Sequence, residues 1–241
     1  MEWTDEAVVL GARPFGEGKA LVELFAREHG RTGGLAHSAR RTSAALQPGN
    51  LLRVGWRART AEQLGVLAQT ELLSPFAASA MNDAGALAAI ASTSALLRAC
   101  AERQAYPELF DAVLVLLETL GEPELWPAVY ARFELGLLAA LGYGLDLGAC
   151  ALSGETEDLA WVSPRSGRAA SRAAGAAYAD KLLPLPGFLA QPSVAVEQGD
   201  VADAFALAGY FLEQRVFERR GEGLPPARRR LIEALGHSSR L

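Results

Sequence analysis

The pattern of apolar residues changes at Pro75, and this change constrains the fold more than any other feature of the chain. Before Pro75, short apolar runs are separated by residues that favour turns, such as Gly30, Gly33-Gly34 and Gln47-Pro48-Gly49-Asn50. After Pro75, alanine and leucine recur at helical spacing. The sequence therefore predicts a β region followed by a mainly α-helical region. The candidate strands are residues 7–10, 20–26, 35–38, 51–58 and 65–72.

Residues 51–58 show the clearest alternation in the β region. Leu52, Val54 and Trp56 fall on one face of an extended strand, whereas Arg53 and Arg57 fall on the other. One face is therefore predicted to join a core and the other to carry positive charge. Five short strands suit a small closed barrel such as the oligonucleotide-binding (OB) fold. We predict an OB-fold barrel over residues 1–78.

The helical region is predicted to form a second domain, residues 79–241, which makes the chain α+β and multidomain. Asn82 or Asp83 can cap its first helix, and Pro107 is placed to begin the next one. Residues 145–195 differ from the rest, because they are rich in glycine, serine and proline and show few helical periods. We expect an irregular segment there.

Composition excludes several classes of protein. Half of the residues are hydrophobic and 21% are charged, so the chain can bury enough apolar surface to fold. Two cysteines, Cys100 and Cys150, cannot staple a fold of this size, which suits a reducing cytoplasm. The chain begins with acidic residues and has no apolar run long enough to cross a bilayer, so we expect neither an export signal nor a membrane partner.

The sequence lacks motifs for nucleotide hydrolysis or other catalysis. Gly18-Lys19 has neither the preceding glycine nor the following hydroxyl residue of a phosphate-binding loop. The three histidines are scattered, with no cysteine or carboxylate at metal-binding spacing. We therefore predict that the protein is not an enzyme and has no catalytic residues. A small-molecule enzyme with its site in residues 145–195 is kept as an alternative.

The N-terminal region carries an excess of positive charge, although the whole chain has a net charge of −5. Between Arg27 and Arg59, seven arginines face a single acid, Glu28. OB-fold barrels bind single strands through a positively charged groove and aromatic side chains, and Phe15 lies in a glycine-flanked loop suited to stacking. The predicted DNA-binding residues are Arg13, Phe15, Lys19, Arg27, Arg31, Arg40, Arg41, Arg53, Arg57 and Arg59.

A second interpretation of this basic surface remains open. It can be a charged face that contacts an acidic protein, with DNA binding incidental, and the helical domain would then be a protein-interaction scaffold. A competition between an acidic peptide and a labelled oligonucleotide separates the two interpretations.

Several segments, taken in order, resemble the RecO family of recombination mediators. No single one is as specific as a nucleotide-binding loop, but they arrive in the same order as in the family and span nearly the whole chain. They are EWTDEAVVLG at residues 2–11, RPFGE at 13–17, LFAREHGR at 24–31, LQPGNL at 46–51, FELGLL at 133–138, LGY at 141–143, Cys150, and VSPRSG at 162–167.

The resemblance implies a function in bacterial DNA repair. Proteins of this family bind single- and double-stranded DNA, anneal complementary strands, and with the partner RecR help RecA to replace single-strand-binding protein at gaps. They also bind the acidic C-terminal tail of single-strand-binding protein and need no nucleotide hydrolysis. The resemblance thus implies a cytoplasmic, nucleoid-associated protein with DNA contacts on the barrel, and with protein contacts and room for further DNA contacts on the helical domain.

One departure from the family concerns zinc. Many relatives hold zinc with two Cys-x-x-Cys pairs around the Ser-Pro-x-x-Gly segment, because thiolates fix a loop that has little core of its own. The four corresponding positions here are Cys150, Ser153, Ser171 and Ala174. Since one thiolate cannot hold structural zinc, we predict a zinc-finger-like segment without metal and no cofactor. Packing of Leu152, Leu159, Trp161 and Val162 is expected to order it.

Overall fold

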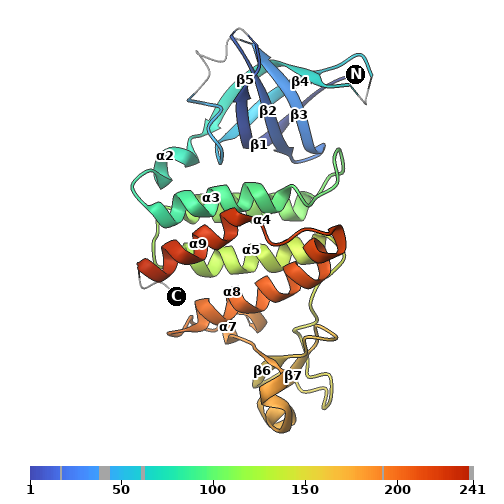
Figure 1. The fold of residues 1–241 in the computed structure, drawn as a ribbon, viewed down its shortest axis with the longest axis vertical. Coiled ribbons are helices and arrows are strands. Elements are labelled where there is room, and N and C mark those ends of the chain that lie inside the picture. Colours follow the sequence, from blue (N-terminus) through green and yellow to red (C-terminus); the bar gives the residue numbers. More distant parts are fainter. Residues whose placement is uncertain (17, 38–43, 61–62, 192, 239–241) are drawn as a thin grey trace. The chain divides into compact units, whose positions relative to one another are not determined.

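The structure is a computed structural model that describes residues 1–16, 18–37, 44–60, 63–191 and 193–238 (Figure 1). These residues form two compact units. The first consists of Met1–Glu122 with Pro225–Leu231, and the second of Pro123–Leu224 with Ile232–Leu241. Helix α9, Pro226–His237, contributes residues to both. Within the described ranges, no helix is both long enough and apolar enough to cross a membrane.

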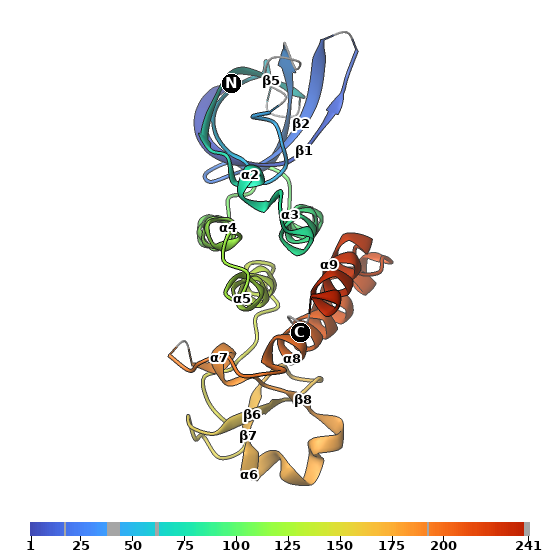
Figure 2. The same ribbon diagram turned by 90° about the vertical axis from the view of Figure 1, so that its left-hand side faces the viewer.

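The first unit begins with a closed five-stranded barrel in the order β1-β2-β3-β5-β4, which confirms the predicted OB-fold region. Its neighbouring strands are antiparallel, except that β3 and β5 pair in parallel. Figure 2 views the ring of strands close to its axis. The strands are β1 Glu2–Pro14, β2 Lys19–Ala26, β3 Gly30–His37, β4 Leu51–Arg57 and β5 Gly65–Ser74.

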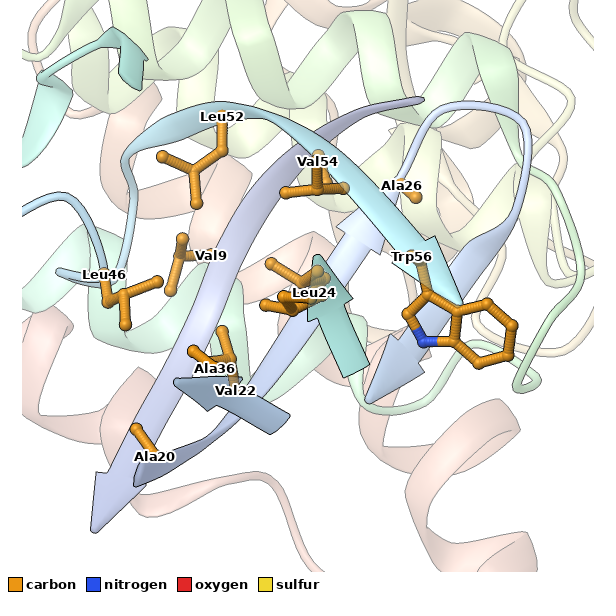
Figure 3. Close-up of a cluster of buried hydrophobic side chains, with 12 residues drawn as sticks. Val9, Ala20, Val22, Leu24, Ala26, Ala36, Leu46, Leu52, Val54 and Trp56 are labelled. Atoms are coloured by element: carbon orange, nitrogen blue, oxygen red, sulfur yellow. The ribbon is translucent and has the colours of Figure 1, made fainter. Parts of the chain in front are cut away.

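Apolar side chains from all five strands fill the barrel (Figure 3). On β4 the predicted alternation is confirmed, because Leu52, Val54 and Trp56 are buried while Arg53 and Arg57 are exposed. The buried Trp56 indole also finds a polar partner, since its Nε1 donates to the carbonyl oxygen of Gly33 at 3.0 Å. Trp56 is therefore a core residue, with its one polar atom satisfied.

The prediction that Gly33-Gly34 forms a turn is wrong, because both residues lie inside β3. A Cβ atom at Gly34 would lie 2.8 Å from the side chain of Leu67 on β5. A side chain at Gly34 would push against Leu67, so this glycine serves the close packing of neighbouring strands rather than chain reversal. The turn between β2 and β3 is formed instead by residues 27–29 and leads into Gly30, the first residue of β3, whose φ is +61°.

Three helices complete most of the first unit: α2 Phe76–Ala80, α3 Ala84–Leu97 and α4 Pro107–Thr119. Asp83 caps α3 as predicted, since its carboxylate accepts hydrogen bonds from the backbone N–H groups of Gly85 and Ala86. Phe25 of β2 faces away from the barrel axis and stacks on Phe110 of α4, with ring centroids 6.1 Å apart. The strands give way to helices at residues 75–76, whereas the compact unit ends at Glu122.

The second unit is built on α5 Trp126–Ala140 and α8 Asp200–Phe211. Tyr130 and Phe205 stack across these two helices with ring centroids 5.4 Å apart. Helix α8 continues into a π-helical turn, η2 Leu212–Phe217, and a 3-10 turn, η3 Glu218–Arg220. A buried aromatic contact therefore fixes α5 against α8 in the middle of this unit.

Residues 145–195 contain a small three-stranded sheet that the sequence analysis did not predict. Its order is β7-β6-β8, with β6 Leu159–Val162, β7 Ala169–Ser171 and β8 Leu183–Pro184. The connections include short helices, namely α6 Arg172–Gly175, η1 Ala176–Lys181 and α7 Gly187–Ala190. Val162 is buried as expected, but Leu152 is 71% exposed and does not help to order the segment.

Candidate nucleic-acid interface

The β1–β2 hairpin extends beyond the ring of strands (Figure 2). The reason lies in the pairing of β1: residues Glu2–Val8 are held by β4, whereas the last residues of the strand are held by β2 alone. At the tip, the backbone N–H of Phe15 donates to the carbonyl oxygen of Lys19 at 3.0 Å. Gly16 and Gly18 have positive φ values that let the chain turn.

Three of the predicted DNA-binding residues come together on this hairpin. Phe15 is 48% exposed, and Arg13 and Lys19 are also exposed. Neither cation lies within ion-pair distance of a carboxylate in the part of the chain that the structure describes. The described part of the hairpin therefore presents an exposed aromatic ring and two cations that have no described carboxylate partner. An aromatic ring that stacks on a base and cations that bind phosphate are the two kinds of contact used in single-strand binding.

Four other predicted arginines are paired with carboxylates, which corrects the expectation that this positive charge has few acids near it. Arg27 contacts Asp111 of α4, and Arg31 lies 3.3 Å from both Glu23 and Glu102. Arg53 lies 3.3 Å from Glu71, and Arg57 lies 2.7 Å from Glu2. The count of seven arginines against one acid is thus true of the sequence window but not of the folded surface.

Strand register explains why these acids were missed. In the β1–β4 pair Glu2 lies opposite Arg57, and in the β4–β5 pair Glu71 lies opposite Arg53. Opposite charges directly across a sheet attract each other. The Arg57 guanidinium accordingly lowers the pKa of the Glu2 carboxyl, through a hydrogen bond first and its charge second. An isolated sequence window cannot reveal such partners.

The remaining predicted cations lie apart from this set. Arg59 is exposed in the connection between β4 and β5 and has no ion-pair partner among the described residues. Arg40 and Arg41 lie outside the residues that the structure describes. OB-folds bind oligonucleotides with the connections between β1 and β2 and between β4 and β5. Here Lys19 is the first residue after the former connection and Arg59 lies in the latter, and neither has an ion-pair partner among the described residues.

Sequence reasoning missed two further arginines, Arg98 and Arg103. They line a groove of about 570 Å³ on the outer face of β1, β2 and β3, together with Arg13 and Arg31. Arg98 directly follows α3, and Arg103 lies in the loop between α3 and α4. Neither is among the residues predicted from the sequence to bind DNA. No local pattern marks them, because only the docking of this loop on β3 brings them to the barrel.

The comparisons with known proteins agree along the whole chain. The model "Recombination protein O N terminal" matches residues 1–76, and "Recombination protein O C terminal" matches residues 81–222. This chain belongs to the RecO family. The DNA repair protein RecO of Rhodospirillum rubrum is 46% identical over 98% of this chain and 96% of its own length. That of Hyphomonas neptunium is 42% identical over 98% of both chains, and that of Caulobacter sp. (strain K31) is 45% identical over the full length of both.

As a member of the RecO family, the protein is a DNA repair and recombination protein, and its barrel is the OB-fold of the RecO N-terminal domain. The two family models meet between residues 76 and 81, close to the point where strands give way to helices. The unpaired cations described above, at positions 13, 19 and 59, all lie in the N-terminal match.

The RecO zinc pattern does not fit the residues at the corresponding positions. Cys150 is the single thiol, and its Sγ accepts a hydrogen bond from the backbone N–H of Ser153 at 3.5 Å. The Ser171 hydroxyl accepts one from the backbone N–H of Ala174 at 3.4 Å. In the described ranges no three histidine, cysteine, aspartate or glutamate side chains gather in one place. The residues at these positions make hydrogen bonds, whereas a structural zinc site would require four thiolate or imidazole ligands.

These hydrogen bonds also change the acidity of the thiol. Donors from the side chain of Ser153 and from the backbone of Ser171, Ser153 and Leu152 lower the pKa of Cys150 to about 6. The Ser153 hydroxyl also lies 2.8 Å from a carboxylate oxygen of Glu155, so the two acceptors compete for its single proton. The backbone N–H groups are not part of this competition, and their hydrogen bonds still lower the pKa of Cys150.

Proposed function

We propose that this chain binds single- and double-stranded DNA through its barrel and anneals complementary strands. With RecR it helps RecA to load on gaps that are coated by single-strand-binding protein. It acts in the bacterial cytoplasm, associated with the nucleoid, and it is not an enzyme. The observation that carries the proposal is the β1–β2 hairpin of a RecO-family barrel, where exposed Phe15 lies between Arg13 and Lys19.

The chemistry of the hairpin supports a polynucleotide rather than a small ligand. Stacking a base on an exposed aromatic ring contributes about 1–3 kcal/mol and is tolerant of sequence. Cations beside the ring bind phosphates and release condensed counterions, which favours binding strongly at low salt. A protein that anneals arbitrary strands needs this kind of contact, because it must hold the backbone without reading the bases.

The paired arginines are proposed as secondary contacts. A phosphate group has to displace Glu71 from Arg53 and Glu2 from Arg57, so each contributes less than an unpaired cation does. Arg27 and Arg31 are also paired with carboxylates, so a phosphate group has to displace those acids as well. Arg40, Arg41 and Arg59 are proposed as primary contacts with Arg13 and Lys19, the first two on sequence alone.

The remaining partners are proposed from family membership. RecR, RecA acting indirectly, and the acidic tail of single-strand-binding protein belong to the proposed reaction, with the helical domain as the region that recruits proteins. No pocket is assigned to the tail. We also propose that no zinc is bound, because Cys150 is the single thiol among the four positions.

The test is strand annealing on DNA coated with single-strand-binding protein, with no nucleotide added. Lys19→Ala combined with Phe15→Ala is expected to slow annealing at least tenfold, since it removes a phosphate contact and a stacking surface. Lys181→Ala combined with Tyr178→Ala is the matched control, because it removes the other lysine and an exposed aromatic ring from the second unit.

The control variant should anneal at the wild-type rate. If both double variants anneal equally fast, the hairpin is not the DNA site. The rival interpretation, a protein-interaction scaffold, is tested by competition. A polyglutamate peptide that displaces a labelled oligonucleotide at matched charge concentration would support that rival.

A further inference from the structure

The groove of about 570 Å³ on the outer face of β1, β2 and β3 is lined by four arginines and two glutamates. Two of its arginines and one glutamate come from outside the barrel, from the end of α3 and the loop that follows. The charged residues of the groove are Arg13, Arg31, Arg98, Arg103, Glu23 and Glu102.

The loop after α3 is fixed against β3 by backbone contacts. Arg103 has a φ of +59°, and its N–H donates to the carbonyl oxygen of Arg31 at 2.9 Å. Glu102 forms an isolated bridge to Arg31. At Gly30 a Cβ atom would lie 1.8 Å from the carbonyl oxygen of Gln104, so only glycine permits this approach. The side chains at 102 and 103 are therefore held at the groove by the backbone.

The charges in the groove are partly neutralised from within. Glu23 lies between two arginines, 3.3 Å from Arg31 and 2.8 Å from Arg98. Glu102 adds a second carboxylate at 3.3 Å from Arg31 but is far more exposed than Glu23. Arg13 and Arg103 have no carboxylate partner among the described residues. The groove thus keeps an excess of positive charge and has Glu23 at its centre.

We propose that this groove binds the phosphate backbone of single-stranded DNA, and that Glu23 occupies its arginines until phosphate displaces it. The inference rests on the proposed function and adds to it Arg98 and Arg103 as contacts and Glu23 as an internal competitor. The pairs are partly exposed, so each is weak enough for phosphate to replace. Guanidinium groups bind phosphate and carboxylate in the same bidentate way, so the exchange needs no change of fold.

The position of the groove favours a nucleotide over an acidic peptide. Arg13 lines this groove and also belongs to the hairpin that carries exposed Phe15. The exposed ring of Phe15 and the guanidinium groups of the groove are thus connected through Arg13 on the β1–β2 hairpin. Single-strand binding requires both kinds of contact, whereas an acidic peptide requires the charges alone.

The decisive variant is Glu23→Gln, which removes the competing charge and keeps the shape of the side chain. Its affinity for a labelled oligo-thymidine is expected to rise about two- to fivefold over wild type in fluorescence anisotropy. Glu118→Gln on α4 is the matched control. It changes the net charge equally, is exposed, and has no arginine partner among the described residues. The control is expected to change the affinity by less than about 1.5-fold.

A double-variant cycle tests whether the gain passes through the named arginine. Arg98→Gln should weaken binding by itself, and Glu23→Gln should then give a smaller gain in that background. Arg103→Gln, at an arginine outside any ion pair of the described residues, should also weaken binding. Thermal melts of each variant show that the fold is kept.

The outcomes separate this inference from the proposed function. If Glu23→Gln binds no tighter than Glu118→Gln while Phe15→Ala with Lys19→Ala still loses affinity, the groove inference is overturned and the hairpin site stands. A gain of the same size in the Arg98→Gln background overturns it too. If Glu23→Gln raises the affinity for a polyglutamate peptide but not for the oligonucleotide, the groove is a protein-binding site. Wild-type protein that fails to bind DNA overturns both proposals.

Discussion

Trp56 illustrates how single residues decide the barrel. Its ring is buried, its Nε1 is hydrogen-bonded to the carbonyl oxygen of Gly33, and its ring fills space that Gly65 leaves empty. A Cβ atom at Gly65 would lie 2.0 Å from the indole ring, closer than any real contact. The pair is therefore complementary, and exchanging either residue alone disturbs the packing of the barrel core.

Gly65→Ala is expected to lower the free energy of unfolding by about 1–3 kcal/mol, because the ring has to move in a close-packed core. Gly55→Ala is the control, since a Cβ there meets its nearest neighbour at an ordinary 3.5 Å. It should change the free energy of unfolding by less than about 0.5 kcal/mol. Urea denaturation measures both, and equal losses in the two variants would contradict the role of Trp56.

Cys150 gives a prediction about pH. Its pKa in the folded protein is about 6, below the value of 9.0 for an unperturbed thiol, so the folded state favours the thiolate. The stabilisation is complete above pH 9, declines as the pH falls towards 6, and is lost below that. In Cys150→Ala the free energy of unfolding should therefore decrease less between pH 9 and pH 6 than it does in wild type.

Urea denaturation in the presence of a reductant, at several values of pH from 6 to 9, measures this difference. Cys100→Ala is the control, because it removes the other buried thiol. Parallel pH profiles for wild type and Cys150→Ala would contradict the hydrogen-bonded thiolate.

Elements with a strong local pattern are the ones that the sequence predicts well. The alternation in β4 and the cap at Asp83 are each set by neighbouring residues, and both are as expected. The prediction of a turn at Gly33-Gly34 is wrong because the close neighbour of Gly34 is Leu67, which lies on another strand and leaves no local signal. The short strands β6, β7 and β8 were missed because two to four residues are too few to show a period.

The candidate site also combines features that depend on neighbouring residues with features that depend on distant parts of the chain. The exposed hairpin residues Arg13, Phe15 and Lys19 follow from local turn chemistry, whereas the acids beside Arg53 and Arg57 follow from strand register. Arg98 and Arg103 reach the barrel through a loop that docks on β3 from about seventy residues away in the chain. Local reasoning therefore finds the cations of the strands and hairpin, but neither their acidic partners nor the arginines that a distant loop brings to the barrel.

The irregular segment should be stable without metal. We expect dialysis against EDTA to leave the melting temperature unchanged, because hydrogen bonds around Cys150, Ser153 and Ser171 replace metal–thiolate bonds. Differential scanning calorimetry before and after dialysis checks this, with metal analysis of the same sample. A fall in melting temperature that added zinc reverses would contradict the expectation.

On the scale of the whole molecule, net charge is a poor guide to the partner. The chain carries −5 overall, yet the described part of the barrel displays unpaired cations at its hairpin and groove. Phosphate binding depends on such local charge, because each phosphate that is neutralised releases condensed counterions. Asp111 and Glu102 of the helical region pair directly with Arg27 and Arg31. Acids that lie more than about 10 Å from an unpaired cation of the barrel are screened at ordinary salt and do not prevent that cation from binding phosphate.

The salt dependence of single-strand binding tests most directly the claim that unpaired cations of the barrel hold the phosphates. Arg13→Ala with Lys19→Ala should flatten the slope of log K against log salt by about 1.4, which is two phosphate contacts at about 0.7 each. Arg53→Ala with Arg57→Ala removes the same charge from paired positions and should flatten it less. A hairpin variant with the wild-type slope would contradict the account.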